Sequence, residues 1–103
     1  MSQRLIVRTE AEKDITDAAQ WYEERSSGLS LRFRASLDRA LSLIENNPEL
    51  YAPVYRGLRR ALLRRFPYGV FYVPHGDDIV VVGVLHTSRD PGLWEARLKA
   101  GVS

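Results

Sequence analysis

The chain has no cysteine, only two histidines and no long apolar run. Without cysteine there can be no disulfide or thiolate metal site, and His75 and His86 alone do not make a zinc site. No stretch approaches the roughly 20 apolar residues of a membrane helix, and the first residues lack the apolar core of a signal peptide. We therefore expect a cytoplasmic protein with no metal, no cofactor and no membrane contact.

The length of 103 residues is enough for one domain, which buries about two-thirds of the surface of its unfolded chain. Apolar residues make up 45 % of the chain and charged residues 27 %, which is ordinary for a folded soluble protein. A chain of this size has room for one sheet layer and one helix layer. We therefore treat residues 1–103 as a single domain.

The net charge of +2 conceals a separation of charge along the chain. Residues 10–25 carry six acidic side chains against two basic ones, a local balance of −4. Residues 56–65 carry five arginines and no acid, a local balance of +5. Like charges at this density repel one another unless a partner screens them, so this segment predicts an anionic partner.

The first half of the chain predicts a short strand at residues 5–7 followed by a helix. Thr9 and Glu12 have the spacing of a capping box, in which the Thr9 hydroxyl accepts a hydrogen bond from the backbone amide of Glu12. The helix should end near Arg25, before the break at Ser26–Gly28. Its apolar side chains recur at helical spacing and form one stripe: Ala11, Ile15, Ala18, Ala19 and Tyr22.

A second helix should begin near Ser30 and end at Asn46 or Asn47, because proline at position 48 disfavours helical geometry in the residue before it. It carries a second apolar stripe: Phe33, Leu37, Ala40, Leu41 and Ile44. The two helices should form a hairpin whose stripes bury against a sheet.

The second half of the chain predicts that sheet. Residues 48–57 are interpreted as a loop, and a strand should follow at about 58–66. The apolar and charged residues of this strand alternate poorly, which either a bulge or an edge position would explain. Two further strands, 68–73 and 78–85, should form a hairpin across residues 75–77.

Residues 79–85 are apolar on both parities, which is typical of a strand with both faces covered. Phe71 and Val73 are expected in the core, packed under the helical hairpin. Asp90 and Pro91 can open a short last helix that runs to about residue 99. The predicted fold class is therefore α+β in two layers: an N-terminal strand, a helical hairpin, a three-stranded antiparallel meander and a short C-terminal helix.

Three phrases in this order match a known group of proteins. They are Tyr51-x-x-Val-Tyr-Arg-Gly-Leu-Arg-Arg60, Arg65-Phe-Pro-Tyr-x-Val-Phe-Tyr72, and Val82-x-Val-Leu-His-x-x-Arg-Asp-Pro91 with Trp94 beyond. Ala11-Glu-Lys-Asp-Ile15 and Ala19-x-Trp-Tyr22 also fit. On these phrases the chain resembles the RelE/ParE superfamily of toxins from type II toxin–antitoxin systems, over nearly its whole length.

The resemblance implies a toxin that a cognate antitoxin neutralises, in a hetero-oligomer that contains an antitoxin dimer. One part of such an antitoxin wraps the toxin, and another part binds operator DNA, so the toxin meets DNA only through the antitoxin. One branch of the superfamily cleaves mRNA in the ribosomal A site, and the other poisons DNA gyrase. The residues expected to bind a partner are Arg56, Arg59, Arg60, Arg64, Arg65, Arg89 and Trp94.

Cleavage of RNA needs a base, an acid for the leaving oxygen and cations around the phosphorane. The candidates are His86, Arg89 and Arg65, since a histidine can move a proton and an arginine can clamp a phosphate. After Arg89 the chain has neither tyrosine nor histidine, and Trp94 cannot transfer a proton. The resemblance implies a tyrosine or histidine in the C-terminal segment of the nuclease branch, so the lack of both here favours the ParE-like, gyrase-binding branch. A metal-independent endoribonuclease and a non-toxic relative retained in a DNA-binding complex stay open.

Structural roles compete with each of these functional readings. His86 fits a histidine at the end of a strand that hydrogen-bonds the backbone, and Arg89 fits a residue that holds the last helix against the sheet. Trp94 and Tyr72 fit core or partner-contact positions better than stacking on a base. Trp21 lies off the apolar stripe of the first helix, so we expect it to be partly exposed.

Overall fold

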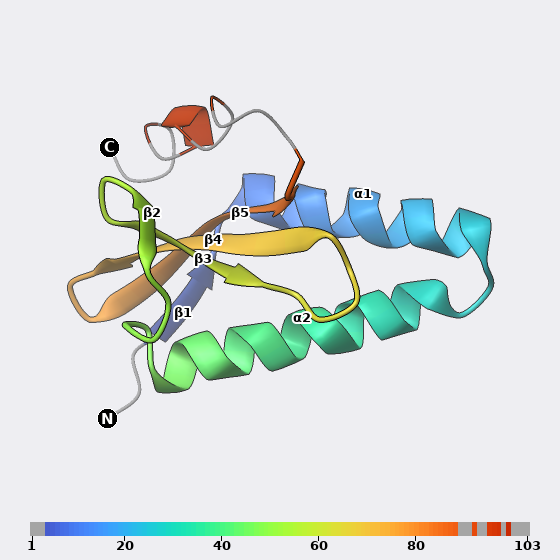
Figure 1. Ribbon diagram of the computed structural model, residues 1–103, viewed down its shortest axis with the longest axis horizontal. Helices are drawn as coiled ribbons and strands as arrows, with labels where there is room; N and C mark the ends of the chain where they lie inside the picture. Colours follow the sequence, from blue (N-terminus) through green and yellow to red (C-terminus); the bar gives the residue numbers. More distant parts are fainter. Residues whose placement is uncertain (1–3, 89–91, 93–94, 98, 100–103) are drawn as a thin grey trace.

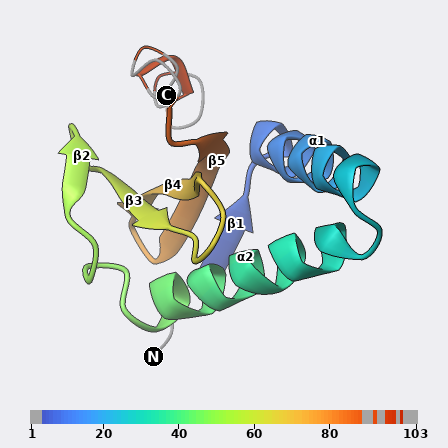
Figure 2. The same ribbon diagram turned by 45° about the vertical axis from the view of Figure 1, so that its right-hand side comes forward.

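The computed structural model describes residues 4–88, 92, 95–97 and 99. The elements are β1 (Arg4–Val7), α1 (Thr9–Arg25), α2 (Leu29–Asn46), β2 (Pro53–Tyr55), β3 (Leu58–Leu62), β4 (Tyr68–His75) and β5 (Asp78–His86). Two views agree that the hairpin of α1 and α2 lies along one side of the sheet (Figure 1, Figure 2). The predicted α+β arrangement is confirmed. The predicted last helix starts outside the described residues, and residues 95–97 within it are helical.

The five strands form one sheet in the order β1-β5-β4-β3-β2. β1 runs parallel to β5, and the other neighbours are antiparallel. The predicted three-stranded meander is therefore extended by β2, which lies inside the expected loop at residues 48–57. Sequence pattern misses β2 because the strand has only three residues and begins with proline. The strand expected at 58–66 ends at Leu62. Of the two explanations for its poor alternation, the edge position is wrong, since β3 lies between β2 and β4.

The start of α1 differs from the predicted capping box. The N-cap is Arg8, which makes no side-chain capping bond, and the Glu12 amide donates to the Arg8 carbonyl at 2.9 Å. The Arg8 amide in turn donates to the carbonyl of Val81 at 3.0 Å, so the chain leaves β1 and enters α1 without a spare residue. Thr9 is thereby the first helical residue rather than the cap.

The turn between the helices is capped by a side chain of the preceding helix. The Glu23 carboxylate accepts hydrogen bonds from the amide of Gly28 at 3.0 Å and from the amide of Ser30 at 3.1 Å. These are amides that the start of α2 would otherwise leave without a partner. Gly28 has a φ of +87°, a left-handed value that suits glycine. The bond from Gly28, followed by the bonds from Ser30, lowers the pKa of Glu23.

The helix-facing layer of the core follows the predicted stripes. Of the stripe residues all are buried except Ile15 and Leu41, which are half-buried and pack against the same cluster. The rings of Tyr22, Phe33 and Phe66 pack together at 4.9–5.5 Å between centroids. This aromatic group joins both helices to the segment between β3 and β4.

The other face of the sheet carries a second buried cluster that contains no helix residue: Leu58, Phe71, Val80, Val82 and Leu85. The pairing of β4 with β5 shifts register between Phe71 and Tyr72. Tyr72 belongs to the helix-facing cluster and Phe71 to the second one. The expectation that Phe71 is core is therefore confirmed, whereas Val73 is only half-buried. The expected packing of both under the helices is wrong, because both belong to the second cluster. Both faces of β5 are covered, as its sequence predicts.

The shortness of β1 leaves the second half of β5 without a strand neighbour on that side, because β1 pairs only with Asp78–Val81. The side chains of Asp14 in α1 and Arg97 instead hydrogen-bond the backbone groups of that edge. The Val84 amide donates to Asp14 Oδ2 at 3.1 Å, and Arg97 Nη1 donates to the Val82 carbonyl at 3.2 Å. The two side chains also form a two-pronged ion pair at 2.6 and 2.8 Å. Hydrogen bonding to Asp14 raises the pKa of the Arg97 guanidinium, so this guanidinium stays charged near neutral pH.

We predict that Arg97→Ala lowers the free energy of unfolding by about 2–3 kcal/mol, because it leaves a part-buried carboxylate and a strand carbonyl short of a partner. Urea unfolding measures the change. Lys13→Ala is the control, since it removes the exposed Lys13–Asp17 ion pair from the same helix and should have a small effect. Equal losses in the two variants would show that the Asp14–Arg97 pair does not brace the edge.

We predict that Glu23→Gln destabilises the protein in a pH-dependent way. The pKa of Glu23 is lower in the folded state than its ordinary value of 4.5, so its stabilising effect is fully present above that value. The effect is lost as the pH falls through the folded pKa. The difference in melting temperature between wild type and variant should therefore be largest near neutrality and shrink toward about pH 3. A difference that stays constant over this range would contradict the capping role.

Candidate functional site

The five arginines of residues 56–65 do not form one surface. Arg56 is exposed at the β2–β3 turn, with a φ of +43° and its guanidinium carbon 5.4 Å from the centre of the Tyr55 ring. Arg59 and Arg60 are half-buried neighbours on β3, paired with Tyr72 and Phe71 of β4 respectively. Successive residues of a strand point to opposite faces, so these two side chains leave the sheet in opposite directions.

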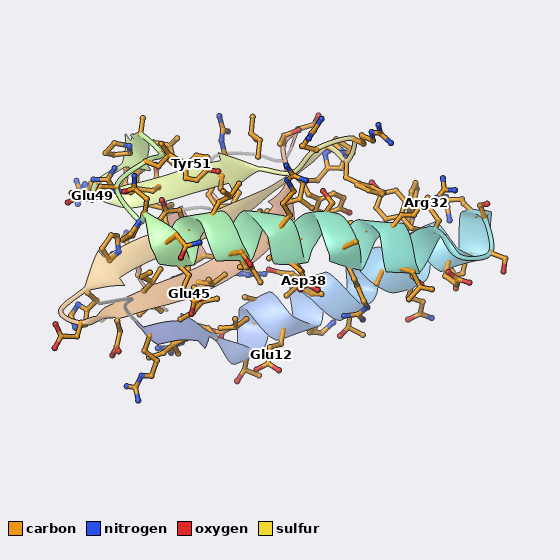
Figure 3. All side chains as sticks on the ribbon, turned by 90° about the horizontal axis from the view of Figure 1, so that it is seen from below. Glu12, Arg32, Asp38, Glu45, Glu49 and Tyr51 are labelled. Atoms are coloured by element: carbon orange, nitrogen blue, oxygen red, sulfur yellow. The ribbon has the colours of Figure 1, made fainter. Side chains whose placement is uncertain are left out.

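Arg59 serves the loop between α2 and β2. Its Nη1 donates to the carbonyls of Tyr51 and Glu49, two residues of this loop that are labelled in Figure 3. The Tyr72 hydroxyl donates to the carbonyl of Pro48 in the same loop at 2.6 Å. Burial raises the pKa of Tyr72 to about 12. Arg59 and Tyr72 together fasten the loop to the sheet, so the fold itself uses this arginine.

The side chain of Arg60 passes close to the backbone of Gly69 in the neighbouring strand. A Cβ placed on Gly69 would lie only 2.9 Å from the Cγ atom of Arg60, so the Arg60 stem passes over the glycine. The glycine leaves room for the aliphatic part of the arginine on the face away from the helices.

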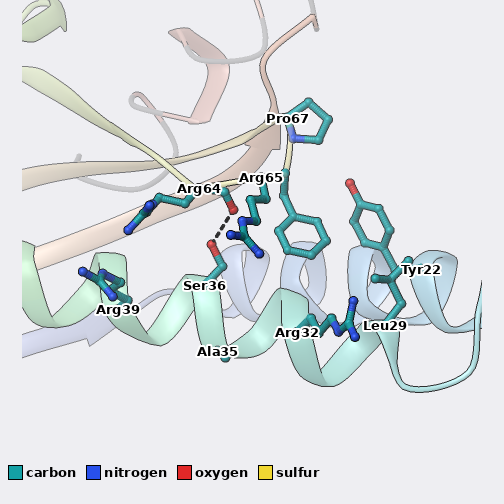
Figure 4. Close-up of a pocket in the computed structure, with 10 residues that line it drawn as sticks. Tyr22, Leu29, Arg32, Ala35, Ser36, Arg39, Arg64, Arg65 and Pro67 are labelled. Carbon is teal, nitrogen blue, oxygen red and sulfur yellow. Dashed lines mark hydrogen bonds between the residues drawn. The ribbon is translucent and has the colours of Figure 1, made fainter.

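Arg64 and Arg65 come together with two arginines of α2 that the sequence analysis did not single out. The four line a groove of about 730 Å³ between α2 and the segment that connects β3 to β4 (Figure 4). The lining residues are Tyr22, Leu29, Arg32, Ala35, Ser36, Arg39, Arg64, Arg65, Phe66 and Pro67. We call this feature the arginine groove. A spacing of seven residues, two helical turns, puts Arg32 and Arg39 on one face of α2, and that spacing was the available signal.

The connecting segment is held in a defined shape. The Leu63 amide donates to the Tyr68 carbonyl at 2.9 Å, and the Ser36 hydroxyl of α2 donates to the Arg64 carbonyl at 2.9 Å. Arg65 has a φ of +68°, a left-handed conformation that is uncommon for a residue with a side chain. Backbone strain of this kind persists only where the surrounding structure imposes it. The turn thus presents both arginine side chains beside α2.

The arginine groove is electrostatically one-sided. Its lining residues include no carboxylate, and within residues 4–88 the guanidinium groups of its arginines form no ion pair. In Figure 3, Asp38 and Glu45 lie on the side of α2 that looks toward α1, and Arg32 lies near the start of the helix on another side. Helical geometry likewise places Asp38 and Glu45 away from the groove face. The groove is therefore a cationic site on an apolar floor.

His86 lies in a different hollow, of about 550 Å³, together with Trp21, Tyr68 and Asp17. Its Nδ1 accepts the Ser88 amide at 3.1 Å, and its ring meets the Tyr68 ring edge-on at 5.3 Å. This is the strand-end role that competes with catalysis. The structure does not bring His86 into the arginine groove with Arg65, and the predicted site residues Arg89 and Trp94 lie outside the described residues.

Trp21 is 47 % exposed, which confirms its expected position off the helical stripe. The Arg25 guanidinium lies 3.6 Å from the centre of its ring, and the ring meets Tyr22 edge-on at 5.0 Å. In the part of the chain that the structure describes, no three histidine, aspartate or glutamate side chains gather as a metal site would require. None of the described helices is long and apolar enough to cross a membrane.

Comparison with known proteins identifies the family. The family described as the ParE toxin of the type II toxin–antitoxin system parDE matches residues 5–91. The chain belongs to the ParE toxin family. This match spans α1 to β5 and all of β1 but its first residue, and it confirms the ParE-like assignment within the RelE/ParE superfamily.

Relatives of this ParE-family chain include the toxin ParE2 of two Mycobacterium tuberculosis strains, CDC 1551 / Oshkosh and ATCC 25618 / H37Rv. Each is 26 % identical over 99 residues, which covers 95 % of this chain and 94 % of the relative. Among solved structures, a chain of the chromosomal ParDE toxin–antitoxin system from P. aeruginosa superposes with a TM-score of 0.76. That match covers 84 % of this chain and 98 % of the other at 14 % identity, so it supports the fold.

We predict that Arg59 is needed for stability and that Arg64 is not. Arg59→Ala should lower the free energy of unfolding by about 1–3 kcal/mol, because two loop carbonyls lose a charged donor. Arg64→Ala should change it by less than about 0.5 kcal/mol, since the side chain is exposed and only the backbone carbonyl is used. Chemical denaturation measures both, and a larger loss for Arg64→Ala would reverse the assignment.

Proposed function

We propose that this protein is the toxin of a type II toxin–antitoxin pair, that it inhibits DNA gyrase by protein–protein binding, and that a cognate antitoxin neutralises it in the cytoplasm. The observation that carries the proposal is the match of residues 5–91 to the ParE toxin family. The expected partner complex is a hetero-oligomer with an antitoxin dimer, and operator DNA is reached only through the antitoxin. The fold-level similarity to a chain of a ParDE system supports this pairing.

The geometry of the described residues supports binding over hydrolysis. His86 and Arg65 line two different hollows, which meet at Tyr22 and Pro67, and the Nδ1 of His86 accepts a hydrogen bond from the backbone. A general acid or base must lie within hydrogen-bond reach of the same reacting group that the cations stabilise. The arginine groove, in contrast, has the charge and shape of a docking surface, and positive charge of this kind steers association with an acidic partner.

The alternative is a ribosome-dependent, metal-independent endoribonuclease. The observation that favours it is the arginine groove itself, since closely spaced guanidinium groups can also hold the phosphates of RNA. A non-toxic relative retained in a DNA-binding toxin–antitoxin complex is the third reading. The three differ in what the purified protein does to gyrase and to mRNA.

We predict that the purified toxin abolishes DNA supercoiling by gyrase and leaves ribosome-programmed mRNA intact. The two assays are run side by side with the same preparation, and addition of the cognate antitoxin should restore supercoiling. Cleavage of mRNA in the A site with supercoiling unaffected would establish the endoribonuclease instead. Activity in neither assay, with operator binding by the toxin–antitoxin complex preserved, would favour the non-toxic relative.

A further inference from the structure

The arginine groove joins two chemical features that a partner would have to match. Its rim carries the guanidinium groups of Arg32 and Arg39 from α2 and of Arg64 and Arg65 from the opposite wall (Figure 4). Its floor is apolar and includes Phe66 and Tyr22. A ligand that satisfies only one feature would leave the other exposed to water.

The rim charges are not required by the fold. All four side chains are exposed, and among the described residues none forms an ion pair. Like charges gathered in one groove repel one another and cost stability. An anionic occupant would relieve this repulsion and accept paired hydrogen bonds, because a guanidinium group matches a carboxylate with two parallel N–H donors.

The floor favours a protein segment over a nucleic acid. The Phe66 ring packs edge-on against Tyr22 at 4.9 Å and against Phe33 at 5.4 Å. Nucleic acids use aromatic rings that are open for stacking of successive bases, whereas Phe66 is half-buried among other rings. Leu29 and Pro67 extend the apolar lining. An apolar side chain flanked by carboxylates fits both the floor and the rim.

We propose that the arginine groove binds an acidic amphipathic peptide segment of a protein partner. In the bound state the carboxylates of the segment pair with Arg32, Arg39, Arg64 and Arg65, and one large apolar side chain packs on Phe66 and Tyr22. The inference rests on the proposed function and deepens it, because it names the chemistry of the partner segment that the toxin would bind. It does not depend on which cellular target the toxin inhibits.

The test uses a fluorescein-labelled twelve-residue synthetic peptide of glutamate and leucine at helical spacing, with binding measured by fluorescence anisotropy at low salt. One control peptide carries glutamine in place of glutamate, and another carries alanine in place of leucine. We expect both controls to bind at least about tenfold more weakly than the parent peptide. Absence of parent binding, or equal binding of either control, would overturn the proposal.

The site is tested with matched charge reversals on α2. Arg32→Glu should raise the dissociation constant of the parent peptide about fivefold, and Arg32→Glu combined with Arg64→Glu should raise it at least about tenfold. Arg34→Glu is the control, because Arg34 is exposed on the opposite face of the same helix and does not line the groove. It should raise the dissociation constant less than about twofold. Equal effects of Arg32→Glu and Arg34→Glu would show that the peptide binds through general charge attraction, and would refute the groove as its site.

Two further measurements complete the test. The groove variants should melt at the wild-type temperature or slightly above it, because they remove like-charge repulsion; a marked loss of stability would make these arginines structural. A thymidine twelve-mer is tested as a competitor of the parent peptide. If it displaces the peptide at equal or lower concentration, the groove binds nucleic acid and the proposal of a peptide ligand is wrong. Peptide binding without gyrase inhibition would refute the proposed function alone, and gyrase inhibition without peptide binding would refute this inference alone.

Discussion

The unequal length of two neighbouring strands is the constraint on which the rest of the structure depends. β5 has nine residues and β1 has four, so half of one edge of β5 needs partners that no strand supplies. Asp14 accepts from one strand amide, Arg97 donates to one strand carbonyl, and the two side chains neutralise each other. The pair fixes α1 against the sheet. Because α2 packs on α1 through Tyr22 and Phe33, the wall of the arginine groove follows from the same contact.

The helices could be predicted from the sequence and the sheet only in part. Apolar spacing located both helices within a residue or two, because each stripe is buried on a single surface. The capping box was wrong because Arg8 still hydrogen-bonds β5, so no free turn exists for Thr9 to cap. β2 has three residues without apolar alternation, so no pattern within its own sequence could reveal it.

The candidate site was harder to predict than the fold. The sequence predicts that all five arginines of residues 56–65 bind a partner, but strand alternation sends Arg59 toward the loop after α2 and Arg60 to the other face. Only Arg64 and Arg65 reach the groove, and their partners Arg32 and Arg39 come from a helix about 30 residues earlier in the sequence. Charge density along the chain predicts an anionic partner, but only the packing of α2 against the β3–β4 segment brings these four arginines into one groove.

The outer position of β2 limits how the molecule can assemble. A sheet grows when an incoming strand finds a row of open amides and carbonyls, and a long flat border would let copies of the chain polymerise. β2 offers three residues, and its first is a proline with no amide hydrogen. This border is thereby blunted against templated growth. Recognition on that side must rely on side chains, which discriminate between partners as a bare backbone does not.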